Sequence, residues 1–129
     1  MSSVHENTQK LLELVGQGQA AEAIRQFYAD DVEIIEATGE TWQGMETQLK
    51  RLEEWQSGIQ EIHDGGISAV TVNEDTGVSM VESWMDITVK GGTRTNFEEV
   101  EVYNWSPDDK ITRARFYYNA PNMGNGAGN

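Results

Sequence analysis

The stretch that decides the fold is FYADDVEIIEATGETWQG, residues 27–44. A helical apolar pattern ends at Tyr28, a pair of aspartates interrupts it, and the apolar run that follows predicts a strand over about residues 32–37. Glu36 lies where this strand leaves the apolar core, just before a glycine turn. The acid is either a solvated strand end or a group held at the mouth of a pocket. Burial in such a mouth would raise its pKa and make it a usable base near neutral pH.

Outward from this stretch, the sequence predicts two helices before it, then one more helix and four long strands after it. Ser3 and Glu6 have the spacing of a capping box, which starts the first helix near Val4. Gly91-Gly92 is typical of a two-residue hairpin turn, and Asp64-Gly65-Gly66 of a bulge or bend. The predicted helices cover about residues 4–15, 19–28 and 45–56, and the strands cover 32–37, 59–73, 78–90, 93–105 and 110–119.

This order of elements is typical of an α+β domain. Because strands this long must coil strongly, we expect three N-terminal helices packed on a strongly curved, mostly antiparallel sheet, forming a cone-shaped α+β barrel. Such a cone can hold a small ligand. The 129 residues fit a single domain, expected over residues 1–121, and the glycine- and asparagine-rich residues 122–129 are expected to be disordered.

The composition argues against several classes of function. The net charge is −13, from 22 acids against 9 bases, so nucleic acids and anionic membranes are not expected as partners. The chain has no cysteine and shows no metal-binding spacing of histidines or carboxylates, so we expect no metal and no cofactor. Because the sequence shows neither a secretory signal nor a membrane-spanning run, the expected location is the cytoplasm.

Two segments together resemble the NTF2-like superfamily, and within it the SnoaL-like group, which has the fold of ketosteroid isomerases and polyketide cyclases. They are the opening stretch, residues 27–44, and VEVYNWSPDDKITRARFYYN, residues 100–119. The resemblance covers about residues 6–121 and implies the fold more strongly than the function. The superfamily includes isomerases, cyclases, dehydratases, epoxide hydrolases and binding or accessory domains.

The resemblance to ketosteroid isomerases implies roles for two acids. Glu36 falls where those enzymes carry the aspartate that abstracts a proton, and Glu101 falls where they carry a protonated aspartate that donates to the oxyanion. Leu11 stands where they carry a tyrosine of the oxyanion hole, so ketosteroid isomerase activity itself is not expected.

The resemblance to limonene epoxide hydrolases covers one residue of a set of three. Asp86 matches one acid of their Asp-Arg-Asp set, whereas Trp84 and Phe116 stand at the other two positions. That chemistry is therefore not expected either. The SnoaL-type cyclases, which use one acid among aromatic residues, remain compatible with this sequence.

The face of each strand decides which residues can meet. Alternation alone would send the aliphatic set Val81, Met85 and Ile87 to the helices and the acidic and aromatic set to water. The resemblance implies the opposite for this strand and for the two long strands that follow it. Because both faces carry large apolar residues, we expect the outer face to be covered as well, by a homodimer formed through it. The resemblance turns inward Trp84, Asp86, Glu101, Tyr103, Phe116 and Tyr118.

The candidate site combines acids and aromatic rings. If Glu101 and Asp86 share a cavity, repulsion would force one of them to keep its proton, whereas Glu82 and Glu99 are expected at the rim. A bend after His63 can aim this residue into the site, where it could relay a proton. The candidate catalytic residues are Glu36, Asp86 and Glu101, and the candidate ligand contacts are Trp42, Trp55, His63, Trp84, Tyr103, Phe116 and Tyr118.

Two functions fit these residues. The first is a cofactor-free enzyme that binds a small apolar organic ligand in the cone and transfers a proton next to a carbonyl, with Glu36 as base. The second is a non-catalytic, dimeric ligand-binding or accessory domain, in which the acids are rim charges or bind an amine. A shared point of approach for Glu36 and Glu101 would favour the enzyme.

Overall fold

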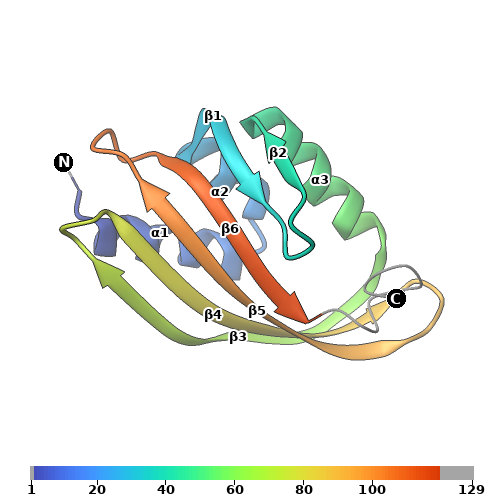
Figure 1. Cartoon of the computed structure of the whole chain (residues 1–129). Coiled ribbons are helices and arrows are strands. Elements are labelled where there is room, and N and C mark those ends of the chain that lie inside the picture. The colour runs from blue at the N-terminus through green and yellow to red at the C-terminus, as the bar shows by residue number, and fades with distance from the viewer. Residues whose placement is uncertain (1, 120–129) are drawn as a thin grey trace.

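The computed structural model describes residues 2–119, so the prediction of a disordered tail over residues 122–129 lies outside the described part of the chain. Three helices and six strands follow one another in the order shown in Figure 1. They are α1 (Val4–Gly16), α2 (Ala20–Phe27), β1 (Tyr28–Ile35), β2 (Thr41–Gln43), α3 (Met45–Ser57), β3 (Ile59–Asn73), β4 (Val78–Val89), β5 (Arg94–Trp105) and β6 (Ile111–Asn119).

The strands form one sheet in the order β2-β1-β6-β5-β4-β3. Every neighbouring pair is antiparallel except β1 and β6, which are parallel. The predicted α+β class and the meander of four long strands are therefore confirmed. The three-residue strand β2 was not predicted.

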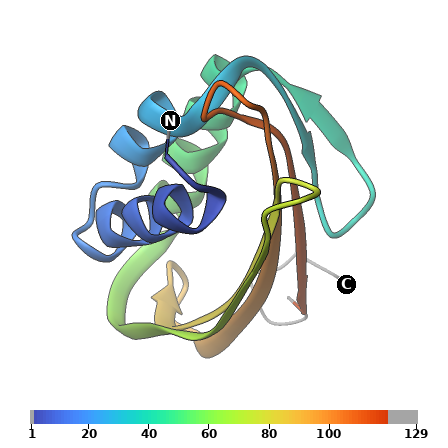
Figure 2. The same ribbon diagram turned by 90° about the vertical axis from the view of Figure 1, so that its left-hand side faces the viewer.

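The predicted closure into a barrel is wrong, because the sheet of the described residues is open. Its two edges are β2 and β3, at opposite ends of the strand order. Helix α3 connects these two edge strands along the chain and contacts β1, β2 and β3. All three helices lie on one side of the sheet, which we call its inner face (Figure 2).

Local sequence signals set the helix ends. The Ser3–Glu6 capping box is present at the start of α1, as predicted. The carboxylate of Glu74, from the turn between β3 and β4, also accepts from the N–H groups of Val4 and His5, each at 3.0 Å. Both carboxylate oxygens thus satisfy orphan donors at the positive end of the helix dipole.

The inner face of the sheet carries two apolar clusters. The larger one lies under α1 and α2 and is closed by fully buried side chains of β1, β4 and β6, namely Val32, Ile34, Val81 and Ile111. The smaller one consists of Ile87, Val89 and Phe97, near the hairpin between β4 and β5. The strand segments between the two clusters carry the acids of the inner face.

The predicted face of β4 is wrong. Val81 pairs directly with Glu101 and Ser83 with Glu99, so the inner residues of β4 are the odd-numbered ones. Trp84 and Asp86, which were expected beside Glu101, therefore point to the outer face. Alternation alone gave the correct orientation for this strand, and the resemblance did not.

The predicted two-residue turn between β4 and β5 is also wrong, and it agrees with the wrong face. Val89 donates its N–H to the carbonyl oxygen of Thr93 at 2.9 Å, so the hairpin loop has three residues, Lys90, Gly91 and Gly92. A two-residue Gly91-Gly92 turn would have paired the strands one residue differently. Because side chains alternate along a strand, a slip of one residue moves every side chain of β4 to the other face.

Candidate functional site

Glu36 follows directly after β1 and is not a solvated strand end, because only 9% of its surface is exposed. Its N–H donates to the carbonyl oxygen of Glu40 at 2.9 Å, and its own carbonyl oxygen accepts from Gly39 at 2.8 Å. Gly39 has φ of 92°, a conformation that glycine adopts without strain. The glycine turn noted in the sequence therefore fixes the backbone that carries the acid.

Both carboxylate oxygens of Glu36 are engaged. The Tyr118 hydroxyl donates to Oε1 at 2.9 Å, and the Arg51 guanidinium from α3 lies 2.5 Å from Oε2. The guanidinium carbon of Arg51 also lies 5.0 Å from the ring centroid of Trp42, a cation–π contact. The buried negative charge of Glu36 is thus compensated by one cation and oriented by one phenol.

Glu101, on β5, is held by two neutral donors. The Tyr103 hydroxyl donates to Oε1 at 2.9 Å, and the Ser83 hydroxyl of β4 donates to Oε2 at 3.1 Å. Burial and the charge of Glu101 together raise the pKa of Tyr103 well above its usual value. Tyr103 therefore stays protonated and acts as a donor.

Glu99 shares the inner face with Glu101 and is its nearest acidic neighbour along β5. Burial is the largest cause that raises the pKa of Glu99 well above its ordinary range, followed by the negative charge and hydrogen bond of Glu101 and then by Glu36. Tyr118 of β6 is its direct cross-strand neighbour. The acid that shares a face of the sheet with Glu101 is thus Glu99, and not Asp86 as the sequence suggested.

The sequence analysis missed Arg51 and Ser83 as site residues, and it expected Glu99 at the rim. The signal was present in the alternation Phe97-Glu99-Glu101-Tyr103, which puts all four side chains on one face of β5. We call Glu36, Glu99 and Glu101, together with Ser83, Arg51 and Tyr118, the acid band. It crosses the inner face between the two apolar clusters.

Aromatic rings border the acid band on the side of α3. Phe97 lies 5.3 Å from Tyr118 and 6.4 Å from Trp55 of α3, measured between ring centroids. None of the thirteen residues of α3, all within the described part of the chain, is buried. Met45, Leu49 and Leu52 of α3 are only partly buried where they pack against the large apolar cluster.

The structure thus brings together most of the candidate residues. Glu36, Trp42 and Trp55 lie with the rings and acids of the inner face, and Phe116 is buried in the large cluster beside them. Tyr118 donates to Glu36 and is the cross-strand neighbour of Glu99, which lies two residues before Glu101 on β5.

Three candidates lie elsewhere, on the outer face. Asp86 forms a two-pronged ion pair with Arg94 at 2.7 and 2.9 Å, and the hydrogen bond from Arg94 lowers the pKa of Asp86. Nε2 of His63 lies 2.7 Å from the Thr88 hydroxyl, on the same face as Asp86. Trp84 pairs across strands with Glu98, an exposed residue of the outer face. These residues cannot reach the acid band, because the sheet lies between.

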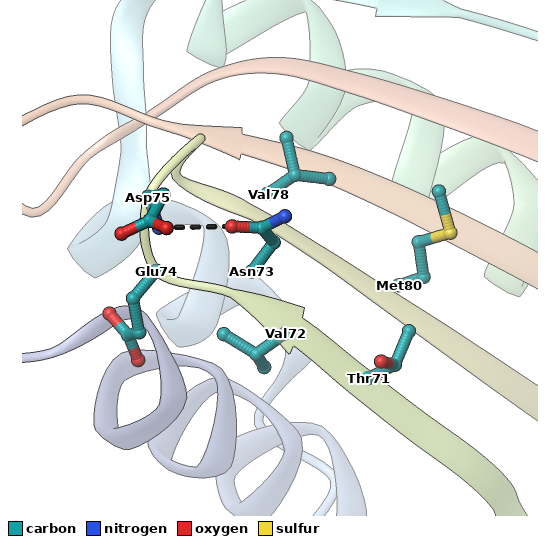
Figure 3. A pocket seen from close by; sticks show the side chains of 7 residues that line it. All are labelled: Thr71, Val72, Asn73, Glu74, Asp75, Val78 and Met80. Atoms are coloured by element: carbon teal, nitrogen blue, oxygen red, sulfur yellow. Dashed lines mark hydrogen bonds between the residues drawn. The ribbon is translucent and has the colours of Figure 1, made fainter.

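The structure has two hollows, and the lining of the larger one includes Ser83, Glu99 and Tyr118 of the acid band. One, of about 370 Å³, is lined by residues at the turn between β3 and β4, including Glu74 and Met80 (Figure 3). Asn73 and Asp75 in this turn are joined by a hydrogen bond, so its polar groups mainly stabilise the turn itself. The other hollow, of about 460 Å³, is lined by Trp84, Glu98, Val100 and Tyr117 among others.

Neither a metal site nor a membrane span is found in the described part of the chain. Residues 2–119 contain no group of three or more histidines and carboxylates placed to hold a metal ion. No helix among them is both long and apolar enough to cross a membrane.

Comparison with known families and structures gives a consistent result. The sequence profile of the SnoaL-like domain matches residues 2–118. A candidate SnoaL-like polyketide cyclase from Mesorhizobium loti is 30% identical and superposes with a TM-score of 0.81, covering 91% of this chain and all of the other. No curated protein matches significantly.

More distant structures share the fold alone. An NTF2-like protein of unknown function from Burkholderia pseudomallei is 13% identical, with a TM-score of 0.78 over 95% of both chains. A protein with a ketosteroid isomerase-like fold from Catenulispora acidiphila, crystallised with trimethylamine, is 18% identical, with a TM-score of 0.67 over 80% of this chain and 78% of the other. The resemblance to the NTF2-like superfamily is therefore confirmed.

Proposed function

The chain belongs to the SnoaL-like family, and we propose that it binds a small apolar organic molecule over the acid band and transfers a proton within it, without a cofactor. Glu36 is the general base, and the Glu101 carboxyl with its neighbour Glu99 supplies the acid. The reaction class is proton transfer next to a carbonyl, as in isomerisation or cyclisation. The observation that carries the proposal is a buried Glu36, fixed by Tyr118 and Arg51, beside two further carboxyl groups and a set of rings.

The chemistry follows from the environment of the acids. Glu36 takes a proton from the carbon next to the ligand carbonyl, so the C–H bond breaks, an O–H bond forms on Glu36, and the carbonyl becomes an enolate. The acid beside Glu101 stabilises the enolate oxygen by a hydrogen bond. Isomerisation is completed when Glu36 returns the proton to a different carbon of the same ligand.

The partners of Glu36 impose one condition on this step. Arg51 and Tyr118 occupy the two carboxylate oxygens, so one contact must open before Glu36 accepts a proton. Tyr118 is the better candidate to release it, because its ring borders Phe97 and the partly covered apolar surface. A ligand that enters over Phe97 would therefore displace the Tyr118 hydroxyl and leave Arg51 in place.

A non-catalytic binding or accessory domain is the second candidate function. In it the acid band would bind an amine, as the trimethylamine complex of the Catenulispora protein suggests by analogy of fold. The outer face would form a homodimer, since Met80 and Tyr117 are 44% and 47% exposed there and Val100 and Val102 are only partly buried.

A thermal-shift screen of neutral ketones, polyketide-like phenols and amines tests the proposal. Glu36→Gln keeps the shape of the side chain and removes the base, and Glu98→Gln on the outer face of the same sheet is the matched control. We expect hits whose stabilisation falls in Glu36→Gln and persists in Glu98→Gln. Equal stabilisation of all three proteins by every hit would remove Glu36 from the site.

Turnover distinguishes the two functions. An enzyme should exchange the acidic C–H hydrogen of a bound ketone for deuterium from heavy water, and Glu36→Gln should abolish this exchange. A binding domain should hold the same ketone without exchange.

A further inference from the structure

We propose that the outer face of the sheet carries a ligand site of its own, the hollow beside Trp84, and that this site binds a small organic cation with a quaternary ammonium group. The site lies apart from the acid band and does not rest on the proposed function. Three features carry it, namely the register of three strands, the seat of one indole ring and the charges beside that ring.

The hollow of about 460 Å³ lies behind the acid band, on the outer side of β4, β5 and β6. Ser83, Glu99 and Tyr118 line it, and these residues pair with one another across the three strands. Because their side chains point to the inner face, their backbone forms the floor of the hollow. All three helices lie on the inner side of the sheet (Figure 2), so no helix of the described residues covers the hollow.

The walls of the hollow come from the two neighbouring cross-strand rows, whose side chains point outward. One row joins Glu82 of β4 to Val100 of β5 and Tyr117 of β6, and the other joins Trp84 to Glu98. Two aromatic rings and two carboxylates therefore lie around one backbone floor.

The indole of Trp84 is seated against the neighbouring strand β3. Gly66 of β3 pairs with Trp84, and a Cβ atom on this glycine would lie 2.9 Å from Nε1 and 3.2 Å from Cε2 and Cζ2 of the ring. A larger residue at this position would push the indole away, so the glycine makes room for it. The ring is only half-buried and keeps part of its surface open to a ligand.

Two carboxylates flank this ring. Glu98 is the direct cross-strand neighbour of Trp84, and Glu82 lies two residues before it on the same face of β4. Both glutamates are exposed, and none of the ion pairs within residues 2–119 involves either of them. The negative charge beside the indole is therefore not neutralised by an ion pair of the described chain.

Two arginines of the outer face are already engaged. Arg94 is paired with Asp86 at 2.7 Å, and the guanidinium carbon of Arg115 lies 4.9 Å from the ring centroid of Tyr117. The second contact is a cation–π interaction with a ring that lines the hollow. The walls thus already accept one cation from the protein itself.

The chemistry of the walls selects the class of ligand. A ring beside carboxylates attracts an organic cation through the quadrupole of the ring and through Coulomb attraction, and quaternary ammonium groups are bound in this way. An anion would meet both carboxylates, in a chain whose net charge is −13. Residues 2–119 contain no group of three or more histidines and carboxylates placed for a metal ion, which favours an organic cation.

The hollow and a homodimer through the outer face exclude one another at Tyr117. This side chain lines the hollow and is 47% exposed. A second copy packed on it would cover the walls, whereas a monomer, or a dimer formed through another surface, leaves them open. The oligomeric state is therefore part of the test.

Choline and 3,3-dimethylbutan-1-ol, which carries carbon in place of the nitrogen, are a matched pair of probes. In a proton–nitrogen NMR titration at constant ionic strength, choline chloride should shift the indole N–H signal of Trp84 and leave that of Trp55 unchanged. The neutral alcohol should bind about fivefold more weakly, because it lacks the charge. Equal affinities for both probes, or no saturable shift of Trp84 with choline, would overturn the inference.

Substitutions in the walls locate the cation, with the backbone N–H signal of Val100 as the reporter. Trp84→Leu should abolish choline binding, and Glu98→Gln should weaken it about threefold. Gly66→Ala should weaken it as well, because the indole loses its seat. Glu13→Gln on α1 removes the same charge on the other side of the sheet and should leave the affinity unchanged. An equal loss in Glu13→Gln and Glu98→Gln would mean that only the net charge attracts choline, and would contradict the site.

Two further measurements separate this site from its alternatives. In the thermal-shift screen, an amine bound at the hollow loses its stabilisation in Glu98→Gln, whereas a ligand of the acid band loses it in Glu36→Gln, so either site can fail while the other stands. Sedimentation velocity gives the oligomeric state, and a soluble paramagnetic probe should broaden the Trp84 indole signal when the hollow is open. A dimer in which this signal is protected would mean that a second copy occupies the outer face, and the inference would be wrong.

Discussion

The large apolar cluster and the acid band occupy the same inner face of one sheet, yet they are covered in different ways. Helices α1 and α2 seal the cluster with side chains that are almost fully buried, among them Leu11, Ala23 and Phe27. Helix α3 lies over the acid band and buries none of its own thirteen described residues. The helices that cover the large cluster therefore bury their own side chains deeply, whereas the helix over the acid band does not.

The polar groups of the large apolar cluster and of the acid band also differ, because those of the cluster are uncharged and those of the acid band include carboxyl groups. In the large apolar cluster, the indole N–H of Trp105 donates to the Ser79 hydroxyl at 3.0 Å. This hydrogen bond joins two buried, uncharged groups. In the acid band, Glu36 is paired with the Arg51 guanidinium, whereas the half-buried Glu101 accepts from two neutral hydroxyl groups. Carboxyl groups placed in this way inside a partly buried region are typical of sites that bind or react.

We expect the largest loss of unfolding free energy from a substitution in the large apolar cluster. Ile111 is fully buried, so Ile111→Ala should lower the free energy of unfolding by about 2–5 kcal/mol through lost burial and the cavity left behind. Leu52→Ala on α3 removes a partly buried side chain and should cost clearly less. Urea unfolding of both variants measures the difference, and equal losses would mean that α3 seals its part of the face as tightly as α1 and α2.

We expect the second-largest loss of stability from breaking the ion pair between Arg51 and Glu36 in the acid band. Arg51→Gln leaves Glu36 as an uncompensated, largely buried charge, and we expect a loss of about 2 kcal/mol at neutral pH, below that of a fully buried pair. The additional change Glu36→Gln should recover part of it. On the outer face, Arg94→Gln breaks the exposed pair with Asp86 and should change the unfolding midpoint far less. Equal effects of Arg51→Gln and Arg94→Gln would show that the acid band is as solvated as the outer surface.

We expect the smallest loss of stability from removing the Glu74 carboxylate, which caps the first turn of α1. Glu74→Gln weakens the two bonds to the N–H groups of Val4 and His5 and should cost about 0.5–1 kcal/mol. Hydrogen exchange should show the loss in the first turn of α1, while exchange in α3 stays as in the wild type. An equal acceleration in α3 would mean that the two helices are coupled and that the regions are not independent.

Local signals in the sequence were sufficient for most of the fold. The capping box at Ser3 and the glycine after residue 57 act within a few residues of where they appear, and they predicted the helix ends closely. The predicted break at Asp30 and Asp31 is wrong, because both residues lie within β1, which follows α2 directly at Tyr28. The parallel pairing of β1 with β6 depends on contacts far apart in the chain, such as that of Ile34 with Ala114. No local pattern specifies such contacts.

The candidate site was predictable only in part, for a reason that lies in one turn. The residues of β5, from Phe97 to Tyr103, were assigned correctly to one face because their alternation is unbroken. The neighbouring strand β4 depended on the length of the loop around Gly91 and Gly92, which two glycines do not fix. One extra loop residue moved Asp86 out of the site and left Glu99 as the partner of Glu101.

The four tryptophans provide the most direct test of the central claim, that the acid band beneath α3 is the ligand site. Trp55 borders the band, Trp42 stacks on Arg51, Trp84 lies on the outer face and Trp105 is closed within the cluster. We expect 2-cyclohexen-1-one to shift the indole N–H signal of Trp55, and less strongly that of Trp42, in a proton–nitrogen NMR titration, while Trp84 and Trp105 stay unchanged. A shift confined to Trp84 would place the ligand on the outer face and contradict the account.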